Sequence, residues 1–225
     1  DGQDIGMAVA QELVHLAGNR LLAETCRHRR PHSAVADLVA HAPQFELVHW
    51  QRPDVGPQIA ACRHRPRAER YGRGRTSPEG FYRDSFDYAT FRRVLIDPFR
   101  DGAQTAATTG FQLAAFDVVR DAPVESQWVT APRDAVLIVD GIFLHRPELR
   151  DLWDWSVWLE VPAEVAFARM ALRDGSDPDP AAPSNARYRD GQDLYFREAE
   201  PLAAASVVVD NSDLAHPRRI GEGAR

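Results

Sequence analysis

The stretch Ala135–Pro162, AVLIVDGIFLHRPELRDLWDWSVWLEVP, decides the fold class that we expect. It opens with a continuous apolar run, Ala135 to Val139, which is closed by Asp140. A run this short, rich in β-branched residues and without polar alternation, is typical of a strand covered on both faces. A second apolar run, Ser156 to Val161, follows after one short helical crossover over His145 to Asp154. The pattern therefore predicts two strands of a parallel α/β sheet.

An acid at the carboxyl end of such a strand lies where open α/β sheets place their ligands. Asp140 is therefore a candidate site residue, and the alternative is that it only caps a turn. Strands and helices alternate along much of the rest of the chain. This alternation favours an α/β fold with a doubly wound parallel sheet, flanking helices and right-handed crossovers.

The composition limits the class of protein. A chain of 225 residues can form one α/β domain over residues 1–225. Its net charge of −6 argues against a general nucleic-acid binder. All 27 basic residues are arginine, so any mechanism that requires a lysine is excluded. No apolar run reaches the roughly 18 residues of a membrane span, and no charged-then-apolar leader opens the chain. We expect a cytoplasmic protein without a membrane partner.

The two cysteines, Cys26 and Cys62, have neither a disulfide framework nor the spacing of a metal site. Near the start, a loop with Gly2 and Gly6 precedes a helical pattern from Ala8. The apolar face expected for that helix consists of Val9, Leu13, Val14 and Leu16. A glycine loop that opens a helix can bind phosphate through backbone N–H groups. The chain begins on Asp rather than Met, which leaves open a strand upstream of this loop.

Periodicity and breakers predict the remaining elements. We expect helices over Ala34–Ala40, Asp87–Phe99, Ala163–Arg173 and Arg187–Glu200. We expect strands over Phe45–Trp50 and Ser206–Asp210, the latter being the final strand, and a strand pair or hairpin arm over Phe111–Val119. The apolar face predicted for residues 163–173 is Val165, Ala168 and Leu172, and residues 175–185 form a mobile loop. Arginines cluster over Arg63–Arg75 and at Arg169 and Arg173, where they either hold phosphates bidentately or form solvated faces.

Four segments carry a resemblance to a known family. They are HRPRAERYGRGRTSPEGFYRDSFDY (64–88), AVLIVDGIFLHRPELRDLWD (135–154), FARMALRDG (167–175) and RYRDGQDLYFREAEPLAAASVVVDN (187–211). Together they resemble the bacterial branch of the uridine kinase family of P-loop nucleoside kinases. The resemblance covers residues 64–213 and leaves residues 1–63 as a degenerate or incomplete part. It implies a P-loop kinase fold that uses ATP and Mg²⁺ to phosphorylate the 5′-hydroxyl of uridine or cytidine. The implied partners are a small nucleoside and a nucleotide, and a homo-oligomer stays open.

The resemblance assigns roles to single residues. Asp140 matches the acid after the Walker B strand, a position associated with Mg²⁺. Arg169 and Arg173 match the lid arginines that approach the triphosphate. Phosphoryl transfer needs such groups because its catalysis is mostly positioning and charge neutralisation. The alternative for the two arginines, four residues apart on a helix, is simple exposure to solvent.

The nucleoside side of the site has its own matches. Asp87 is the first match for an acid that holds ribose hydroxyls, and Asp84 is the second. Tyr82, Phe116 and Asp117 fall where the family builds its nucleoside pocket. For Phe116 the alternative, a place in the hydrophobic core, carries more weight.

The first third departs from the family. The family's phosphate loop is G-x-x-x-x-G-K-[ST], whose lysine reaches the phosphates and whose hydroxyl binds Mg²⁺. The nearest match is GQDIGMA, residues 2–8. It has one residue too few between Gly2 and Gly6, and it has Met7 and Ala8 in place of the lysine and the Ser/Thr. Where relatives carry an aspartate as general base, this chain has residues 60–63, Ala-Ala-Cys-Arg.

Three explanations of these departures stay open. The protein is a kinase relative that has lost catalysis, its first third reflects a disturbed reading frame, or it holds phosphates by arginines alone. The expected function is ATP-dependent 5′-phosphorylation of uridine or cytidine. The alternatives are a catalytically impaired nucleoside- or nucleotide-binding relative and a kinase for another small hydroxyl substrate.

Overall fold

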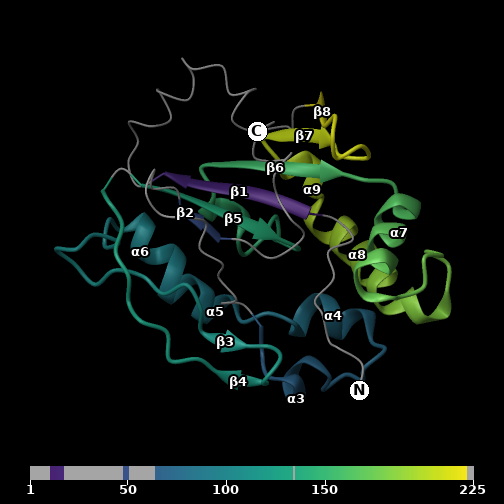
Figure 1. Ribbon diagram of the computed structural model, residues 1–225, viewed down its shortest axis with the longest axis horizontal. Coiled ribbons are helices and arrows are strands. Elements are labelled where there is room, and N and C mark those ends of the chain that lie inside the picture. The colour runs from purple at the N-terminus through teal and green to yellow at the C-terminus, as the bar shows by residue number, and fades with distance from the viewer. Residues whose placement is uncertain (1–10, 18–47, 51–63, 134, 222–225) are drawn as a thin grey trace.

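The computed structural model describes residues 11–17, 48–50, 64–133 and 135–221. These residues form a mixed α/β fold around one six-stranded sheet, in the order β2-β5-β1-β6-β7-β8 (Figure 1). The strands are β1 (Gln11–Ala17), β2 (Val48–Trp50), β5 (Val136–Gly141), β6 (Trp155–Glu160), β7 (Val207–Asp210) and β8 (Arg218–Gly221). Among these described strands, β6 and β7 alone pair in parallel, and the other neighbours are antiparallel. Strands β5 and β6 confirm the two predicted strands.

Strand β1 lies between β5 and β6, with Leu13 opposite Asp140 on one side and Val157 on the other. The predicted helix from Ala8 is therefore wrong over Gln11–Ala17. A segment of seven residues with four apolar side chains is compatible with the period of a helix and with that of a strand. Its pairing with a strand on each side makes it a strand in the fold. Because β1 separates β5 from β6 and runs against both, the described residues do not form the expected doubly wound parallel sheet.

The parallel pair β6–β7 is joined by a helical crossover. It consists of α7 (Ala163–Asp174), a 3₁₀ turn (Pro183–Asn185), α8 (Ala186–Ala199) and α9 (Pro201–Ala204). Helices α7 and α8 confirm the two helices predicted for this region. The 3₁₀ turn at the end of the segment predicted as a loop, and α9, were not predicted. Helix α7 ends at Gly175, whose φ of 74° is the left-handed cap expected of a terminal glycine. The prediction that the strand at Ser206–Asp210 is the final one is wrong, because β8 follows β7 and pairs antiparallel with it.

The buried face of α7 differs from the predicted one. Its buried side chains include Phe167 and Met170, against which Tyr188 of α8 packs. Leu172, placed on the apolar face by prediction, is 89% exposed. The contact with Tyr188 of α8 determines which face of α7 is buried. The positions of the apolar residues in this short helix were not enough to predict that face.

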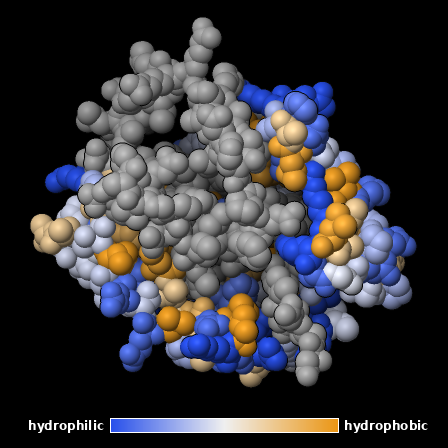
Figure 2. Space-filling model, in the orientation of Figure 1, coloured by the Kyte–Doolittle hydropathy of each residue, from blue (hydrophilic) through white to orange (hydrophobic). Residues whose placement is uncertain are grey.

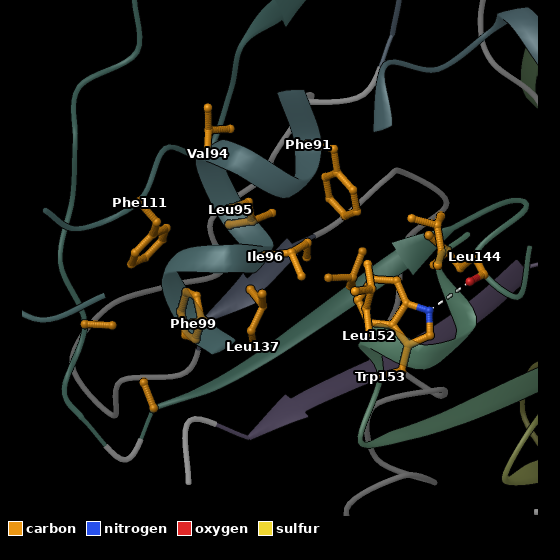
Figure 3. Close-up of a cluster of buried hydrophobic side chains, with 14 residues drawn as sticks. Phe91, Val94, Leu95, Ile96, Phe99, Phe111, Leu137, Leu144, Leu152 and Trp153 are labelled. Carbon is orange, nitrogen blue, oxygen red and sulfur yellow. Dashed lines mark hydrogen bonds between the residues drawn. The ribbon is translucent and has the colours of Figure 1, made fainter. Parts of the chain in front are cut away.

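Helices precede β5 in the chain. They are α3 (Arg67–Arg70), α4 (Pro78–Asp84), α5 (Tyr88–Phe91) and α6 (Asp97–Arg100), with a π-helical stretch (Arg92–Ile96) that joins α5 to α6. The continuous helical run from Tyr88 to Arg100 confirms the helix predicted over Asp87–Phe99. Its apolar side chains form a core with Leu137 and Val139 of β5 (Figure 3). Trp153 closes this core, and its Nε1 donates a hydrogen bond to the carbonyl oxygen of Leu144, 2.8 Å away.

Other expectations are confirmed in part. The arm predicted over Phe111–Val119 is a strand only at β3 (Phe116–Asp117), which pairs with β4 (Ala122–Pro123). The helical crossover between β5 and β6 is reduced to a 3₁₀ turn, Arg150–Leu152. The helix predicted over Ala34–Ala40 and both cysteines lie outside the described residues. Within the described ranges, none of the helices has the length and apolar content needed to cross a bilayer.

Candidate functional site

Asp140 is the penultimate residue of β5 and is only 6% exposed. Side chains alternate along a strand, so Asp140 lies on the face opposite Leu137 and Val139, which pack against the α5–α6 run. The chain then turns sharply, since Phe143 has a φ of 63° that non-glycine residues rarely adopt. Four aromatic rings hold Phe143 in this conformation. A buried carboxylate followed by a strained turn is typical of functional positions.

Tyr82 of α4 contacts this turn. Its ring centroid lies 5.2 Å from that of Phe143, and the side chain is 1% exposed. Burial raises the pKa of Tyr82 to about 12, an effect that Arg146 opposes and Glu198 reinforces. The structure therefore brings Tyr82 next to the segment after Asp140 and packs it in the core.

Arg146 fixes α4 to the loop after β5. Its guanidinium lies 4.4 Å from the ring centroid of Tyr82 and 5.0 Å from that of Tyr88, and its Nη1 donates to the carbonyl oxygen of Tyr82 at 2.6 Å. Nη2 pairs with Glu148 at 2.7 Å. Burial lowers the pKa of Arg146, but Tyr88 and Glu148 outweigh it and the net shift is upward. Arg146 was assigned no role from the sequence alone. The available signal was an arginine placed shortly after the apolar residues Ile142 to Leu144.

The two candidate ribose acids are both engaged. Oδ1 of Asp87 accepts a hydrogen bond from the N–H of Thr90 at 3.0 Å and caps α5. Burial raises the pKa of Asp87, but the hydrogen bonds from Thr90 and the charge of Arg65 bring it below its usual value. Asp84 forms an ion pair with Nε of Arg73 at 2.8 Å. Each carboxylate thus already has a structural role.

Phe116 and Asp117 form the short strand β3. Phe116 is buried, in agreement with the core alternative. Oδ1 of Asp117 accepts hydrogen bonds from the N–H groups of Val119 and Arg120, at 2.9 and 3.0 Å. Asp117 therefore stabilises the turn between β3 and β4, which is the usual role of an aspartate at the start of a turn.

The two predicted lid arginines lie on α7. Arg169 donates to the carbonyl oxygens of Asn211 and Ser212, at 3.0 and 2.7 Å, and burial lowers its pKa. Arg173 pairs with its neighbour Asp174 at 3.2 Å. Asn211 directly follows β7, which is three strands from β5, a lateral separation of roughly 14 Å at the usual strand spacing. Arg169 is therefore anchored at another part of the sheet edge that carries Asp140.

The phosphate-loop candidates Gly2, Gly6, Met7 and Ala8 lie outside the described residues. Among the residues that the structure does describe, no three or more His, Cys, Asp or Glu side chains gather as a metal site. Asp140 alone remains as a candidate for the Mg²⁺ of a nucleotide, since Mg²⁺ is commonly bound through one or two carboxylates together with substrate phosphates.

No family model matches this chain, and no solved structure matches it. What can be said about chemistry therefore rests on the residues themselves. They provide one buried acid at the end of β5, an aromatic and arginine cluster behind it, and several arginines held by backbone carbonyls.

Proposed function

We propose that the protein is a uridine kinase-like phosphotransferase, which transfers the γ-phosphoryl group of ATP to the 5′-hydroxyl of uridine or cytidine. The observation that carries the proposal is Asp140, a buried carboxylate at the end of β5 followed by the strained turn at Phe143. The parallel pair β6–β7 with its α7–α8 crossover is the part of the sheet that agrees with a P-loop kinase fold. The antiparallel β1 does not agree with that fold.

Asp140 would hold Mg²⁺ together with the phosphates of the nucleotide. When bound, the ion would neutralise charge on the transferred phosphoryl group. The 5′-oxygen of the nucleoside attacks the γ-phosphorus, the bond to the bridging oxygen of ADP breaks, and the hydroxyl proton passes to solvent. The chain contains no lysine for the phosphates, and Ala-Ala-Cys-Arg replaces the family's base segment. We therefore expect slow turnover, since a general base or a charge-stabilising group each contributes roughly 10²–10⁴ in rate.

The same lack of lysine favours a second candidate function. This is a nucleoside- or nucleotide-binding relative that keeps part of the pocket without turnover. Met7 and Ala8 stand where the family carries its phosphate-binding lysine and its magnesium-binding hydroxyl.

A coupled assay of ADP release with uridine, cytidine and Mg·ATP separates the two functions. We expect uridine-dependent turnover that falls at least roughly 100-fold in Asp140→Ala, because the lost carboxylate serves the transferred charge. The control is Asp193→Asn, which also removes one negative charge but at an exposed position on α8, and it should leave the rate unaltered.

Thermal-shift measurements with uridine and with ATP complete the test. Stabilisation without turnover would support the binding relative and contradict the kinase. The absence of both turnover and stabilisation would contradict both functions.

A further inference from the structure

Three guanidinium groups converge on the ring of Tyr71. The guanidinium carbon of Arg70 lies 5.6 Å from the ring centroid, that of Arg75 lies 5.0 Å away, and that of Arg187 lies 4.7 Å away. Arg70 belongs to α3, Arg75 to the segment between α3 and α4, and Arg187 to the first turn of α8. Figure 1 places α3 at the lower rim of the molecule, where Figure 2 shows hydrophilic residues beside hydrophobic ones. The cluster thus joins segments more than a hundred residues apart.

Charge balance distinguishes two of these arginines from their neighbours. Nearby arginines are matched by carboxylates, in the pairs Arg65–Glu69, Arg70–Asp121 and Arg73–Asp84. Over the described ranges, by contrast, neither Arg75 nor Arg187 forms an ion pair. Two positive charges therefore meet at one tyrosine ring without a protein anion of their own.

Arg187 is held between two aromatic rings. The residue is 9% exposed, and its guanidinium lies between Tyr71 and the ring of Phe81, 5.7 Å away. Its Nη1 donates to the carbonyl oxygen of Arg75, and within the described part of the chain its other N–H groups have no acceptor. The Nε and Nη2 groups of Arg187 are not sealed from solvent, so an anion can reach them and form charge-assisted hydrogen bonds.

We propose that Tyr71, Arg75 and Arg187 form a binding site for the phosphate group of a small molecule. Planar guanidinium forks match phosphate oxygens, and stacking on Tyr71 orients both forks before the ligand arrives. Arg75 is exposed, so a ligand can reach the site from solvent. A bound dianion would also reduce the repulsion between the two positive charges. The arginines of residues 63–75 thereby gain a role that the kinase proposal leaves unassigned.

The experiment titrates inorganic phosphate into the full chain by calorimetry, at an ionic strength held constant with sodium chloride. We expect phosphate to bind the wild-type protein, and Arg75→Gln and Arg187→Gln each to weaken the apparent Kd by roughly tenfold or more, as when one charge-assisted hydrogen bond is lost. Arg93→Gln is the matched control, because this exposed arginine lies on the helical run α5–α6 outside the cluster.

A parallel titration with uridine 5′-monophosphate identifies the source of the phosphate. Tighter binding of the nucleotide, still dependent on Arg75, assigns the site to a phosphorylated nucleoside, whereas equal affinity assigns it to free phosphate. No heat beyond that of matched chloride for either ligand, or equal binding by Arg75→Gln and the wild type, would overturn the proposal. If Arg187→Gln folds poorly, the affinity of Arg75→Gln for phosphate alone decides the test. The result does not depend on ADP release, so failure of the kinase proposal stays distinguishable.

Discussion

At the scale of single residues, several arginines in this protein are held by backbone carbonyls and aromatic rings as well as by carboxylates. Arg146 donates to the carbonyl of Tyr82, Arg169 to two carbonyls after β7, and Arg187 to that of Arg75. A guanidinium suits these sites because its N–H groups spread in a plane and its faces stack on rings. These contacts with carbonyl oxygens and aromatic rings depend on the planar guanidinium group, which a lysine side chain lacks.

Tyr82 gives a test at this scale. Its pKa of about 12 in the folded chain lies above the usual value of 10, chiefly because of burial. Below pH 10 the phenol is protonated in both folded and unfolded chains. Between pH 10 and 12 the unfolded chain loses the proton first, so the free energy of unfolding falls as the pH rises, by about 1.4 kcal/mol for each pH unit. Urea denaturation across this range measures the slope.

The variant Tyr82→Phe isolates this effect. No lysine titrates in the same range, and the remaining tyrosines are common to both proteins. We expect a shallower dependence of the free energy of unfolding on pH in Tyr82→Phe. Equal slopes in the two proteins would show that Tyr82 is not buried as described.

At the scale of elements, α4 and α8 approach closely at one glycine. A Cβ on Gly191 would lie 2.7 Å from Cδ1 of Phe81 and 3.1 Å from the carbonyl oxygen of Pro78. Phe81 cannot easily give way, because its ring also packs against Phe143 and Tyr188. The glycine is therefore required by the helix contact, even though glycine lowers helix propensity.

Two matched substitutions test this contact by chemical denaturation. Gly191→Ala should lower the free energy of unfolding by about 1–3 kcal/mol, the usual cost of overpacking. Gly80→Ala, on the facing helix, places its Cβ no closer than 3.4 Å to any atom and should be neutral or stabilising by up to about 1 kcal/mol. Equal effects of the two substitutions would contradict the close contact.

The sequence allowed prediction of elements with strong local signals. The continuous apolar runs that became β5 and β6 and the glycine stop of α7 lie as expected. Strand β1 and the buried face of α7 could not be predicted, because both are decided by partners distant in the chain. In the candidate site, the position of Asp140 followed from its strand. The engagement of Asp87 and Arg169 with backbone groups could not be inferred, since these hydrogen bonds exist only in the fold.

At the scale of the whole molecule, β1 connects the two halves of the sheet. One half contains β2 and β5 with the α5–α6 core, and the other contains β6 and β7 with the α4–α8 core. Removing β1 from this arrangement would leave two smaller sheets. The cooperativity of folding should therefore depend on residues 11–17.

Native-state hydrogen exchange tests the place of β1. The amide protons of Gln11–Ala17 should exchange as slowly as those of β5 and β6, because β1 is paired on both flanks. Strand β8, which among the described strands pairs only with β7, should exchange faster and serves as the internal reference. Exchange of residues 11–17 at the rate of an unstructured peptide would contradict the central position of β1.

Among the described strands, β8 lies at one edge of the sheet. A free strand edge offers unpaired backbone groups to any other chain, and proteins commonly limit this hazard with short, charged or bulged edges. Strand β8 has four residues, carries Arg218 and Arg219, and pairs with β7 through a shift of register between Val208 and Val209. A second copy that added to this edge would meet a short strand with an irregular ladder behind it. This edge therefore discourages growth of the sheet into an aggregate.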